Sequence, residues 1–219
     1  VDATAAVLHE ADREGCDISI AHHPIISHPL KRLHASNYVE RCVERAIRRG
    51  IALYACHTNL DSAVGGMSWQ VGSMIGLNDM SVLQPSASGA ETGFGVVGTL
   101  PRSESAMALM SRIKSIFDVG AIRYSDIPSE EFMVQRVAIC TGAGGSLIDD
   151  ALRANAQLYV TADLRYNDFM RGDNRMILAD IGHFESEFCA IRILFDILSK
   201  KINTFAVRKS VNSRNPIHY

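Results

Sequence analysis

The chain has 219 residues, enough for one large domain or two small ones with a true hydrophobic core. Hydrophobic residues make up 47 % and charged residues 21 %, as in ordinary globular proteins. The formal net charge of −2 excludes the strong basic excess of a general nucleic-acid binder. No apolar run approaches the roughly 20 residues that a membrane-spanning helix needs.

Helices and strands are predicted to alternate in the first part of the chain. An apolar periodicity over 5–15 predicts a helix that ends at Gly15, and a short apolar strand follows over 16–21. A second helix over 37–50 and a second strand over 51–58 repeat this order. In the second helix Val39, Val43 and Ile47 form an apolar stripe, and Gly50 closes it. A loop over 59–66 and a helix over 67–77 follow.

The middle of the chain has a different composition. Residues 84–100 are rich in Gly and Ser and are interpreted as a boundary. The unit that follows is predicted to contain a helix, two strands and a Gly-rich turn, over 103–117, 121–125, 134–140 and 141–146. We therefore expect a smaller inserted α/β domain over 89–146, within a main α/β domain formed by 1–88 and 147–219.

The last part of the chain returns to the first pattern. The predicted order is helix, strand, strand, helix and final strand, over 147–155, 157–163, 175–182, 186–200 and 202–210. Strands that alternate with helices favour an α/β class with a largely parallel sheet, here as two α/β domains of similar pattern.

The five cysteines are scattered along the chain without a C-x-x-C motif, and most have apolar neighbours. Free cysteines in such surroundings act as small core residues. We expect reduced thiols and a cytoplasmic location. The cysteines are Cys16, Cys42, Cys56, Cys140 and Cys189.

Metal-ligating side chains directly follow three predicted strands. His22 and His23 come after the first strand, and His57 and Asp61 after the second. "GHFESE", which contains His183 and Glu187, follows the strand near residue 180. Ligands of parallel α/β sheets bind at the strand ends on one side, so three such ends suggest one shared site.

The spacing within these pieces suits metal binding. His183 and Glu187 share one face if the turn between them is helical, and Ser186 is a candidate cap for that helix. Two adjacent imidazoles cannot point the same way on a strand. A turn before Pro24 lets the His22–His23 pair splay around two metals about 3.5–4 Å apart. Imidazole with carboxylate favours Zn, Fe, Mn, Co or Ni.

Each piece taken alone also has an ordinary structural explanation. The histidine pair is compatible with rings that hydrogen-bond backbone carbonyls, and "HTNLD" with local turn chemistry. "GHFESE" is compatible with a helix cap in which the helix dipole favours acidic residues. Because all three segments directly follow predicted strands, metal binding explains them together better than these separate alternatives do.

Five motifs resemble the NIF-three-like family, whose members are often labelled GTP cyclohydrolase I type 2 homologues. The resemblance spans nearly the whole chain, and the end of the chain has the typical "NPIHY". Because the sequence begins without Met, and the family usually begins some tens of residues earlier, we expect that the chain is truncated at its N-terminus. The motifs are "HHPIIS…PLKRL", "IALYACHTNLDSAVGG", "RVAICTGAGGS", "YVTADLRYND" and "ILADIGHFESE".

The resemblance implies a NIF-three-like fold with a dinuclear metal site at the junction of two α/β domains. By position, His22, Asp61 and Glu187 would bind one divalent metal ion. His23 and His183 would bind the second, with Glu187 as the bridge. The resemblance also implies a homohexameric ring whose sites face an internal cavity.

The chain departs from the family pattern in "TADLRYND". Ala162 replaces a glycine, and Asn167 stands where a histidine near the metals is usual. Asn can bind substrate through hydrogen bonds, but it is not a general base near neutral pH. His57 is then the candidate base, although a histidine held in a loop by hydrogen bonds is an equal alternative.

Two further segments have open interpretations. "TGAGGS" either cradles a phosphate with its N–H groups or forms a tight turn, and it lacks the Lys of a P-loop. "KRLHASNYVER" is either a solvated basic face or one that attracts an anionic substrate through Lys31 or Arg32.

These observations lead to two hypotheses. The first is a metal-dependent hydrolase that acts on a nucleotide or other phosphorylated small molecule, with His57 and Asn167 as candidate catalytic residues. The second is a non-catalytic metal carrier or a regulator that binds protein partners. Asn167 in place of a histidine favours the second modestly.

Overall fold

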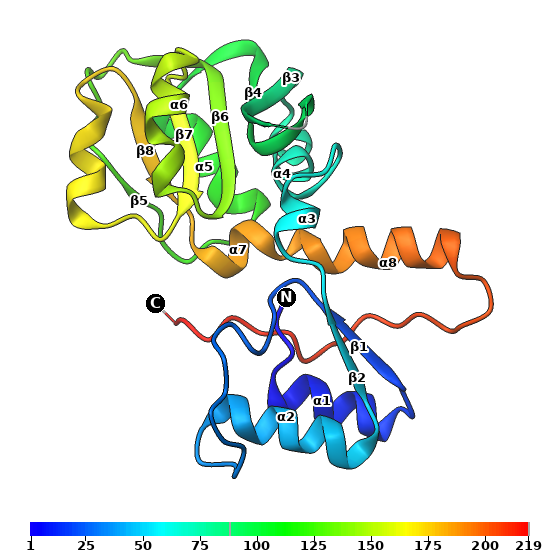
Figure 1. Cartoon of the computed structure of the whole chain (residues 1–219). Coiled ribbons are helices and arrows are strands. Elements are labelled where there is room, and N and C mark those ends of the chain that lie inside the picture. The colour runs from blue at the N-terminus through cyan, green and yellow to red at the C-terminus, as the bar shows by residue number, and fades with distance from the viewer. Residues whose placement is uncertain (88, 219) are drawn as a thin grey trace. The chain divides into compact units, whose positions relative to one another are not determined.

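The computed structural model describes residues 1–87 and 89–218, and the chain is a mixed α/β protein as expected (Figure 1). Its residues group into two compact units. Unit 1 comprises 1–60 and 190–216, and unit 2 comprises 61–189 and the chain end from 217. These boundaries do not coincide with those drawn from composition at 88/89 and 146/147.

Unit 1 has a small parallel sheet and a modest core. Residues Ile18 to Ala21 of β1 pair with Ala52 to Ala55 of β2. Thr4 and Asn37 cap the first two helices through their side chains, and Gly50 ends the second with φ +66°. The elements are α1 (Ala5–Arg13), β1 (Ile18–Ala21), α2 (Tyr38–Arg49), β2 (Ala52–Ala55) and α8 (Cys189–Lys201), of which all but Cys189 belongs to unit 1.

The apolar stripe predicted on α2 is not the face that enters the core. Cys42 is buried with Leu8 of α1, and Ala46 is also buried, whereas Ile47 is 66 % exposed. Small side chains at 42 and 46 allow the two helices to approach closely. Val43 and Ile47 of the stripe instead line an apolar cavity.

The predicted final strand over 202–210 is wrong, because the chain has no regular structure there. Side chains hold this segment to α1. The Glu10 carboxylate accepts hydrogen bonds from Ser210, from Val211 N at 3.1 Å and from Asn212 Nδ2 at 3.0 Å. These bonds outweigh the effect of burial and lower the pKa of Glu10.

Unit 2 is built on a six-stranded sheet with the order β3-β4-β6-β7-β8-β5. β6, β7 and β8 are parallel neighbours, while the other pairs are antiparallel, so the sheet is mixed and not largely parallel. The strands are β3 (Asn78–Ser86), β4 (Gly89–Ser105), β5 (Arg123–Tyr124), β6 (Met133–Ala143), β7 (Leu158–Ala162) and β8 (Ile177–Asp180).

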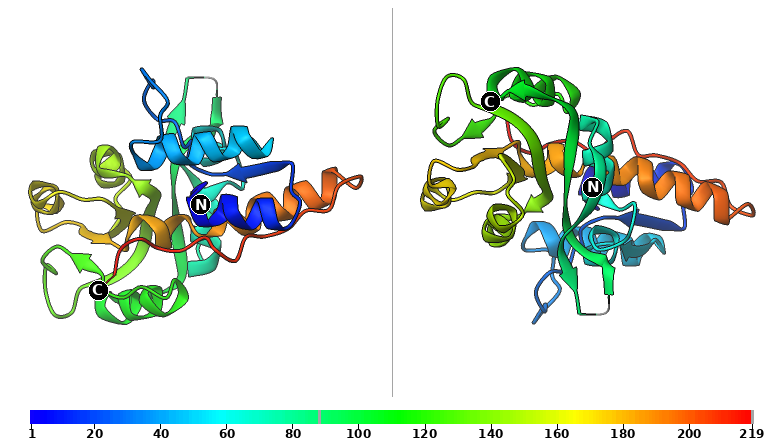
Figure 2. Two further views of the ribbon diagram at one scale, coloured as in Figure 1. Left: turned by 90° about the horizontal axis from the view of Figure 1, so that it is seen from below. Right: turned by 90° about the horizontal axis from the view of Figure 1, so that it is seen from above.

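Helices cover both faces of this sheet (Figure 2). Because side chains alternate along a strand, Val137 and Ile139 pack with α4 and α5, and Ala138 and Cys140 pack with α6. The helical elements are α4 (Met67–Ile75), α5 (Ala106–Ile116), η1 (Gly145–Leu147), α6 (Ile148–Arg153), η2 (Tyr166–Gly172) and α7 (His183–Glu187). Of α3 (Thr58–Asp61), only Asp61 belongs to unit 2.

Most of the Gly/Ser-rich segment predicted as a boundary belongs to the long antiparallel β3–β4 pair, which includes 84–86 and 89–100. Residue 88 lies outside the described residues. At Gly93 an added Cβ would lie 2.1 Å from the carbonyl oxygen of Gln84, so glycine is needed for backbone approach. β4 also pairs with β6, which pairs with β7, so the segment belongs to the centre of unit 2.

Candidate functional site

The histidine pair lies in a turn that follows β1, as Pro24 predicts. The N–H groups of His22 and His23 donate to the carbonyl oxygen of Val1 at 2.9 and 3.3 Å. His22 is 1 % exposed, and its Nδ1 donates to the Cys56 carbonyl oxygen at 2.8 Å. Nδ1 of His23 lies 2.8 Å from Oδ1 of Asp2. The turn lets both rings face one region, which a strand would prevent.

His57 joins this pair to form a cluster of three imidazoles in unit 1. Its ring centroid is 5.3 Å from that of His22 and 5.4 Å from that of His23. One ligand nitrogen from each ring lies within 4.8 Å of the others. His57 is exposed, whereas His22 is buried. The cluster therefore combines donor atoms suited to a transition metal with one ring open to solvent.

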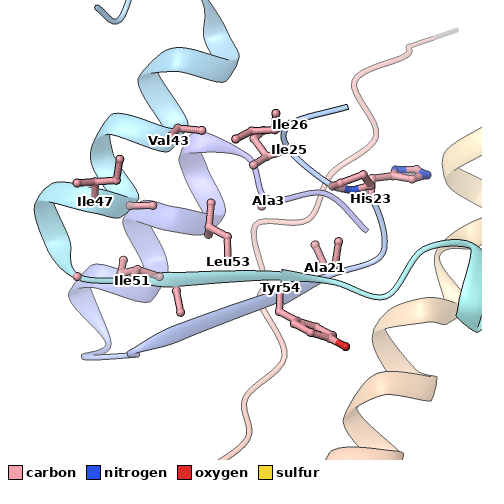
Figure 3. A pocket seen from close by; sticks show the side chains of 15 residues that line it. Ala3, Ala21, His23, Ile25, Ile26, Val43, Ile47, Ile51, Leu53 and Tyr54 are labelled. Carbon is pink, nitrogen blue, oxygen red and sulfur yellow. The ribbon is translucent and has the colours of Figure 1, made fainter. Parts of the chain in front are cut away.

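An apolar cavity of about 540 Å³ borders the same turn in unit 1. Figure 3 shows that the His23 ring points away from the apolar side chains of this cavity, which include Ile26 and Leu53. The nitrogen atoms of His23 are therefore on the side away from the cavity. The side chains that line the cavity are apolar, apart from those of His23 and Tyr54.

In unit 2, His183 and Glu187 lie on one face of α7, as the four-residue spacing predicts. Nε2 of His183 is 3.2 Å from Oε2 of Glu187. Gly182, with φ +89°, forms the sharp turn between β8 and α7. Glu187 is 4 % exposed, and a carboxylate so deeply buried needs a positive partner, which a protonated imidazole or a cation supplies.

A second carboxylate completes the surroundings of His183. Nδ1 of His183 lies 2.7 Å from Oδ2 of Asp163, which directly follows β7. The hydrogen bond with Glu187 raises the pKa of His183, burial opposes this, and Asp163 adds to the rise, so that the pKa reaches about 9. In the metal-free protein the imidazole is therefore protonated at neutral pH.

The backbone around Glu187 is closely fitted. Gly142 has φ +64°, and an added Cβ would lie 2.3 Å from Oε1 of Glu187. The prediction that Ser186 caps the helix is wrong, because Gly182 precedes α7. The Ser186 hydroxyl donates to the His183 carbonyl oxygen and accepts from Gly142 N at 3.0 Å. Ser186 therefore ties α7 to the end of β6, which places Glu187.

Asp61, at the end of α3, shares neighbours with Glu187. Burial raises the pKa of Cys140 and of Cys189 to about 12, and the negative charges of Asp61 and Glu187 add to both increases. The two carboxylates thus lie near the same two thiols within unit 2. Both thiols stay protonated, which excludes them as thiolate nucleophiles near neutral pH.

Two predicted features have no place in these clusters. Asn167 is exposed on η2, and within 1–87 and 89–218 its side chain makes no hydrogen bond. In "TGAGGS" the N–H groups of Gly142 and Gly144 already donate to Ser186 and to Thr161. These amides are used internally, which favours a tight turn over a phosphate cradle.

The structure brings His22, His23 and His57 together in unit 1, and His183 with Glu187 in unit 2. Sequence reasoning missed Asp2, Asp163 and Gly142 as neighbours of these residues. Asp163 carried a usable signal, because it follows a buried strand in the same way as the predicted ligands. The other two carried none, because their partners are distant in the sequence. The histidine partners are His23 for Asp2 and His183 for Asp163.

Comparison with curated proteins identifies relatives along the whole chain. It is 31 % identical over 224 residues to the "GTP cyclohydrolase 1 type 2 homolog" of Lactococcus lactis, covering all of this chain and 83 % of the relative. The protein of the same name from Clostridium perfringens is 30 % identical over 190 residues, or 86 % of this chain and 71 % of the relative. No helix in the described part of the chain is long and apolar enough to cross a membrane.

Solved structures share this fold. The hypothetical protein SA1388 of Staphylococcus aureus superposes with a TM-score of 0.92 at 22 % identity, over all of this chain and 85 % of that protein. The protein ybgI, of unknown function, gives a TM-score of 0.79 at 25 % identity, over 91 % of this chain and 77 % of that protein. The family model for Duf34/NIF3 (NGG1p interacting factor 3) matches residues 1–216, and the chain therefore belongs to this family.

Proposed function

We propose that the protein is a metal-dependent hydrolase that uses two divalent metal ions. The observation that supports this most directly is the donor set at the strand ends. In unit 1, three imidazoles each place one nitrogen within 4.8 Å of the others. In unit 2, an imidazole nitrogen lies 3.2 Å from an oxygen of a buried carboxylate. Clusters of nitrogen and carboxylate donors bind borderline transition metals such as Zn, Fe, Mn, Co or Ni.

The proposed ligands are those that the family resemblance assigns. Unit 1 would contribute the imidazoles of His22 and His23, and unit 2 would contribute Asp61, His183 and Glu187. The residues fit this role. Asp61 and Glu187 supply negative charge near the same thiols, and His22 and His23 each donate through Nδ1 and so retain Nε2 as the basic nitrogen.

When bound, divalent metal ions supply Lewis-acid polarisation of the scissile centre and a hydroxide nucleophile near neutral pH. The protein's own groups would bind the substrate and transfer protons. His57 is the candidate for proton transfer, since its ring is exposed beside His22 and His23. A phosphorylated small molecule, such as a nucleotide, is the proposed substrate class, in keeping with the names of the curated relatives.

The test begins with the metal content of the purified full chain, measured after growth in metal-replete medium. We expect up to two equivalents of transition metal in the wild type and a loss of metal in Asp61→Ala. Asp150→Ala is the control, since Asp150 is a partly buried carboxylate of unit 2 that pairs with Arg153. A wild-type protein without metal contradicts the proposal.

Activity is tested on the same samples with a panel of nucleotides and phosphoesters, in the presence of Mn, Fe or Zn. Turnover by the wild type and by Asp150→Ala, and its absence in Asp61→Ala, supports a hydrolase. Metal binding without turnover of any substrate leaves the second candidate function, a metal carrier or regulator. Asn167 favours this alternative, because its exposed side-chain amide stands where the family usually has a histidine, which could act as a base.

The assembly is a further part of the proposal. We propose a homohexameric ring, as the family resemblance implies. Light scattering combined with size-exclusion chromatography measures the mass directly. A monomer at working concentration contradicts the ring.

A further inference from the structure

Three histidines proposed as metal ligands share one feature: each directs Nδ1 to an oxygen of the protein. For His22 the oxygen is the Cys56 carbonyl at 2.8 Å. For His23 it is Oδ1 of Asp2 at 2.8 Å, and for His183 it is Oδ2 of Asp163 at 2.7 Å.

The chemistry of these acceptors determines the tautomer of each ring. A carbonyl oxygen or an ionised carboxylate oxygen has no proton to donate, so Nδ1 must carry the hydrogen in each pair. The basic nitrogen of the neutral ring is then Nε2. In His183 this is the nitrogen that faces Glu187 Oε2, at 3.2 Å. Metal-binding histidines usually have such a second contact, which fixes the ring and its tautomer.

The backbone around Asp163 supports a specific role for this side chain. Asp163 directly follows β7, and its φ is +56°, an uncommon conformation for a residue with a Cβ. His183 follows β8, the parallel neighbour of β7, so the two residues lie at the same edge of the sheet. The left-handed conformation turns the chain directly after the strand, at the residue whose carboxylate meets Nδ1.

Asp2 is placed by different means within unit 1. Its neighbour Val1 accepts hydrogen bonds from the N–H groups of His22 and His23, which fastens the start of the chain to the histidine turn. The side chain of Asp2 is 40 % exposed and that of Asp163 is 51 % exposed. Ion pairs with this exposure contribute little to stability, so a purely structural role explains neither placement well.

We propose that Asp163 and Asp2 are positioning residues of the metal centre: each holds the imidazole beside it as the Nδ1–H tautomer, so that Nε2 binds the ion. This inference rests on the proposed function, in which His183 and His23 bind metal. It adds two side chains outside the proposed ligand set and assigns them an atom-level role.

The experiment measures zinc affinity of the full chain by competition with a chelator. We expect Asp163→Ala and Asp2→Ala to weaken zinc binding by about 10–100-fold, the usual effect of losing such a partner. Asp163→Asn and Asp2→Asn should weaken it less, because the amide oxygen still accepts from Nδ1 but lacks the charge. The matched control is Asp173→Ala, since Asp173 has φ +49° and an exposed carboxylate that pairs with Arg175.

A spectroscopic readout separates positioning from a general structural effect. Nitrogen-15 spectra of the histidine rings report which nitrogen carries hydrogen. In the zinc-bound wild type, His183 and His23 should be protonated at Nδ1 alone, whereas each alanine variant should show a mixture for the ring that lost its partner. The thermal midpoint of the metal-free alanine variants should match that of Asp173→Ala, which excludes unfolding as the cause.

The outcomes distinguish the inference from the proposed function. Wild-type protein that binds no zinc overturns both. Wild-type protein that binds zinc while the alanine variants bind it with equal affinity, or no more weakly than Asp173→Ala, overturns the positioning role alone. Unchanged tautomers in the variants have the same consequence.

Discussion

The two units present metal-ligating groups in contrasting ways. Unit 1 displays His22, His23 and His57 on turns beside a two-stranded sheet. Unit 2 places Glu187, 4 % exposed, at the end of a six-stranded sheet that helices cover on both faces. A buried carboxylate needs fixed partners to offset its desolvation. Glu187 accordingly lies in the unit with the larger core.

The largest expected effect concerns the core that supports the unit 2 ligands. Ile139 is 1 % exposed in β6, and Ile139→Ala should lower the free energy of unfolding by about 2–5 kcal/mol. Chemical denaturation measures this loss.

In the wild type, hydrogen exchange should be slowest in β6, β7 and β8, which are buried on both faces, and faster in β1 and β2. Slower exchange in β1 than in β7 would contradict the expected difference in local stability between the two units.

A comparison of two glycine variants distinguishes the effect of steric contact with Glu187 from the effect of backbone strain. Gly142→Ala and Gly15→Ala place Cβ at nearly equal φ values, +64° and +65°. Each should cost about 1–2 kcal/mol of stability for the left-handed backbone. At Gly15 the added Cβ meets nothing within 4 Å, whereas at Gly142 it displaces the Glu187 carboxylate.

We therefore expect zinc affinity to fall at least about 10-fold in Gly142→Ala, as for other changes to the surroundings of a metal ligand. Gly15→Ala should bind zinc like the wild type. Isothermal titration calorimetry measures both. Equal affinities in the two variants would show that the close fit of Gly142 to Glu187 has no role in binding.

Alkaline pH should lower the stability of metal-free unit 2, because it removes the proton from His183. The folded pKa of about 9 exceeds the ordinary value of 6.5, so the folded state binds the proton more tightly. The resulting stabilisation is fully present below about pH 6.5 and is lost as the pH rises through 9. Denaturation midpoints measured from about pH 6 to about pH 10 test this expectation. The loss of stability with rising pH should be smaller in His183→Gln. A wild-type profile parallel to that of the variant would contradict the expected coupling.

Acid pH should act on unit 1, with a smaller effect, through Glu40. The N–H of Ser36 lowers the pKa of this carboxyl, burial opposes the change, and the N–H of His34 and the Ser36 hydroxyl add to it. The stabilisation is therefore present above the ordinary pKa of 4.5 and is lost as the pH falls below it. Glu40→Gln should reduce this loss of stability at acid pH, and hydrogen exchange of the amides in α2 measures the effect locally. A loss of stability equal to that of the wild type would contradict the expected role of Glu40.

Much of the local structure was predictable from sequence. The first two helices lie where the apolar periodicity predicts them, and Gly50 ends the second, because helix ends and the 3.6-residue period depend on a few neighbouring residues. The approach of His183 to Glu187 follows from a single helical turn. The break after β1 at the histidine pair follows from Pro24.

Other features were decided by tertiary structure. Composition predicted a boundary at 84–100, but strand pairing with β6 draws this segment into the sheet of unit 2. The predicted strand near Ser210 fails because the Glu10 side chain binds that segment through hydrogen bonds. Local propensity is weak for such short stretches, and the contacts that override it come from residues far away in the chain.

The sequence by itself determined the α/β class, the glycine that ends the second helix and the family to which the five motifs point. The tertiary structure alone decided that Asp2 meets His23, that Asp163 meets His183 and that Gly142 makes room for Glu187. The physical reason is the range of the interactions. Helical periodicity and capping act within one or two turns, whereas these three contacts exist only once segments distant in sequence lie side by side.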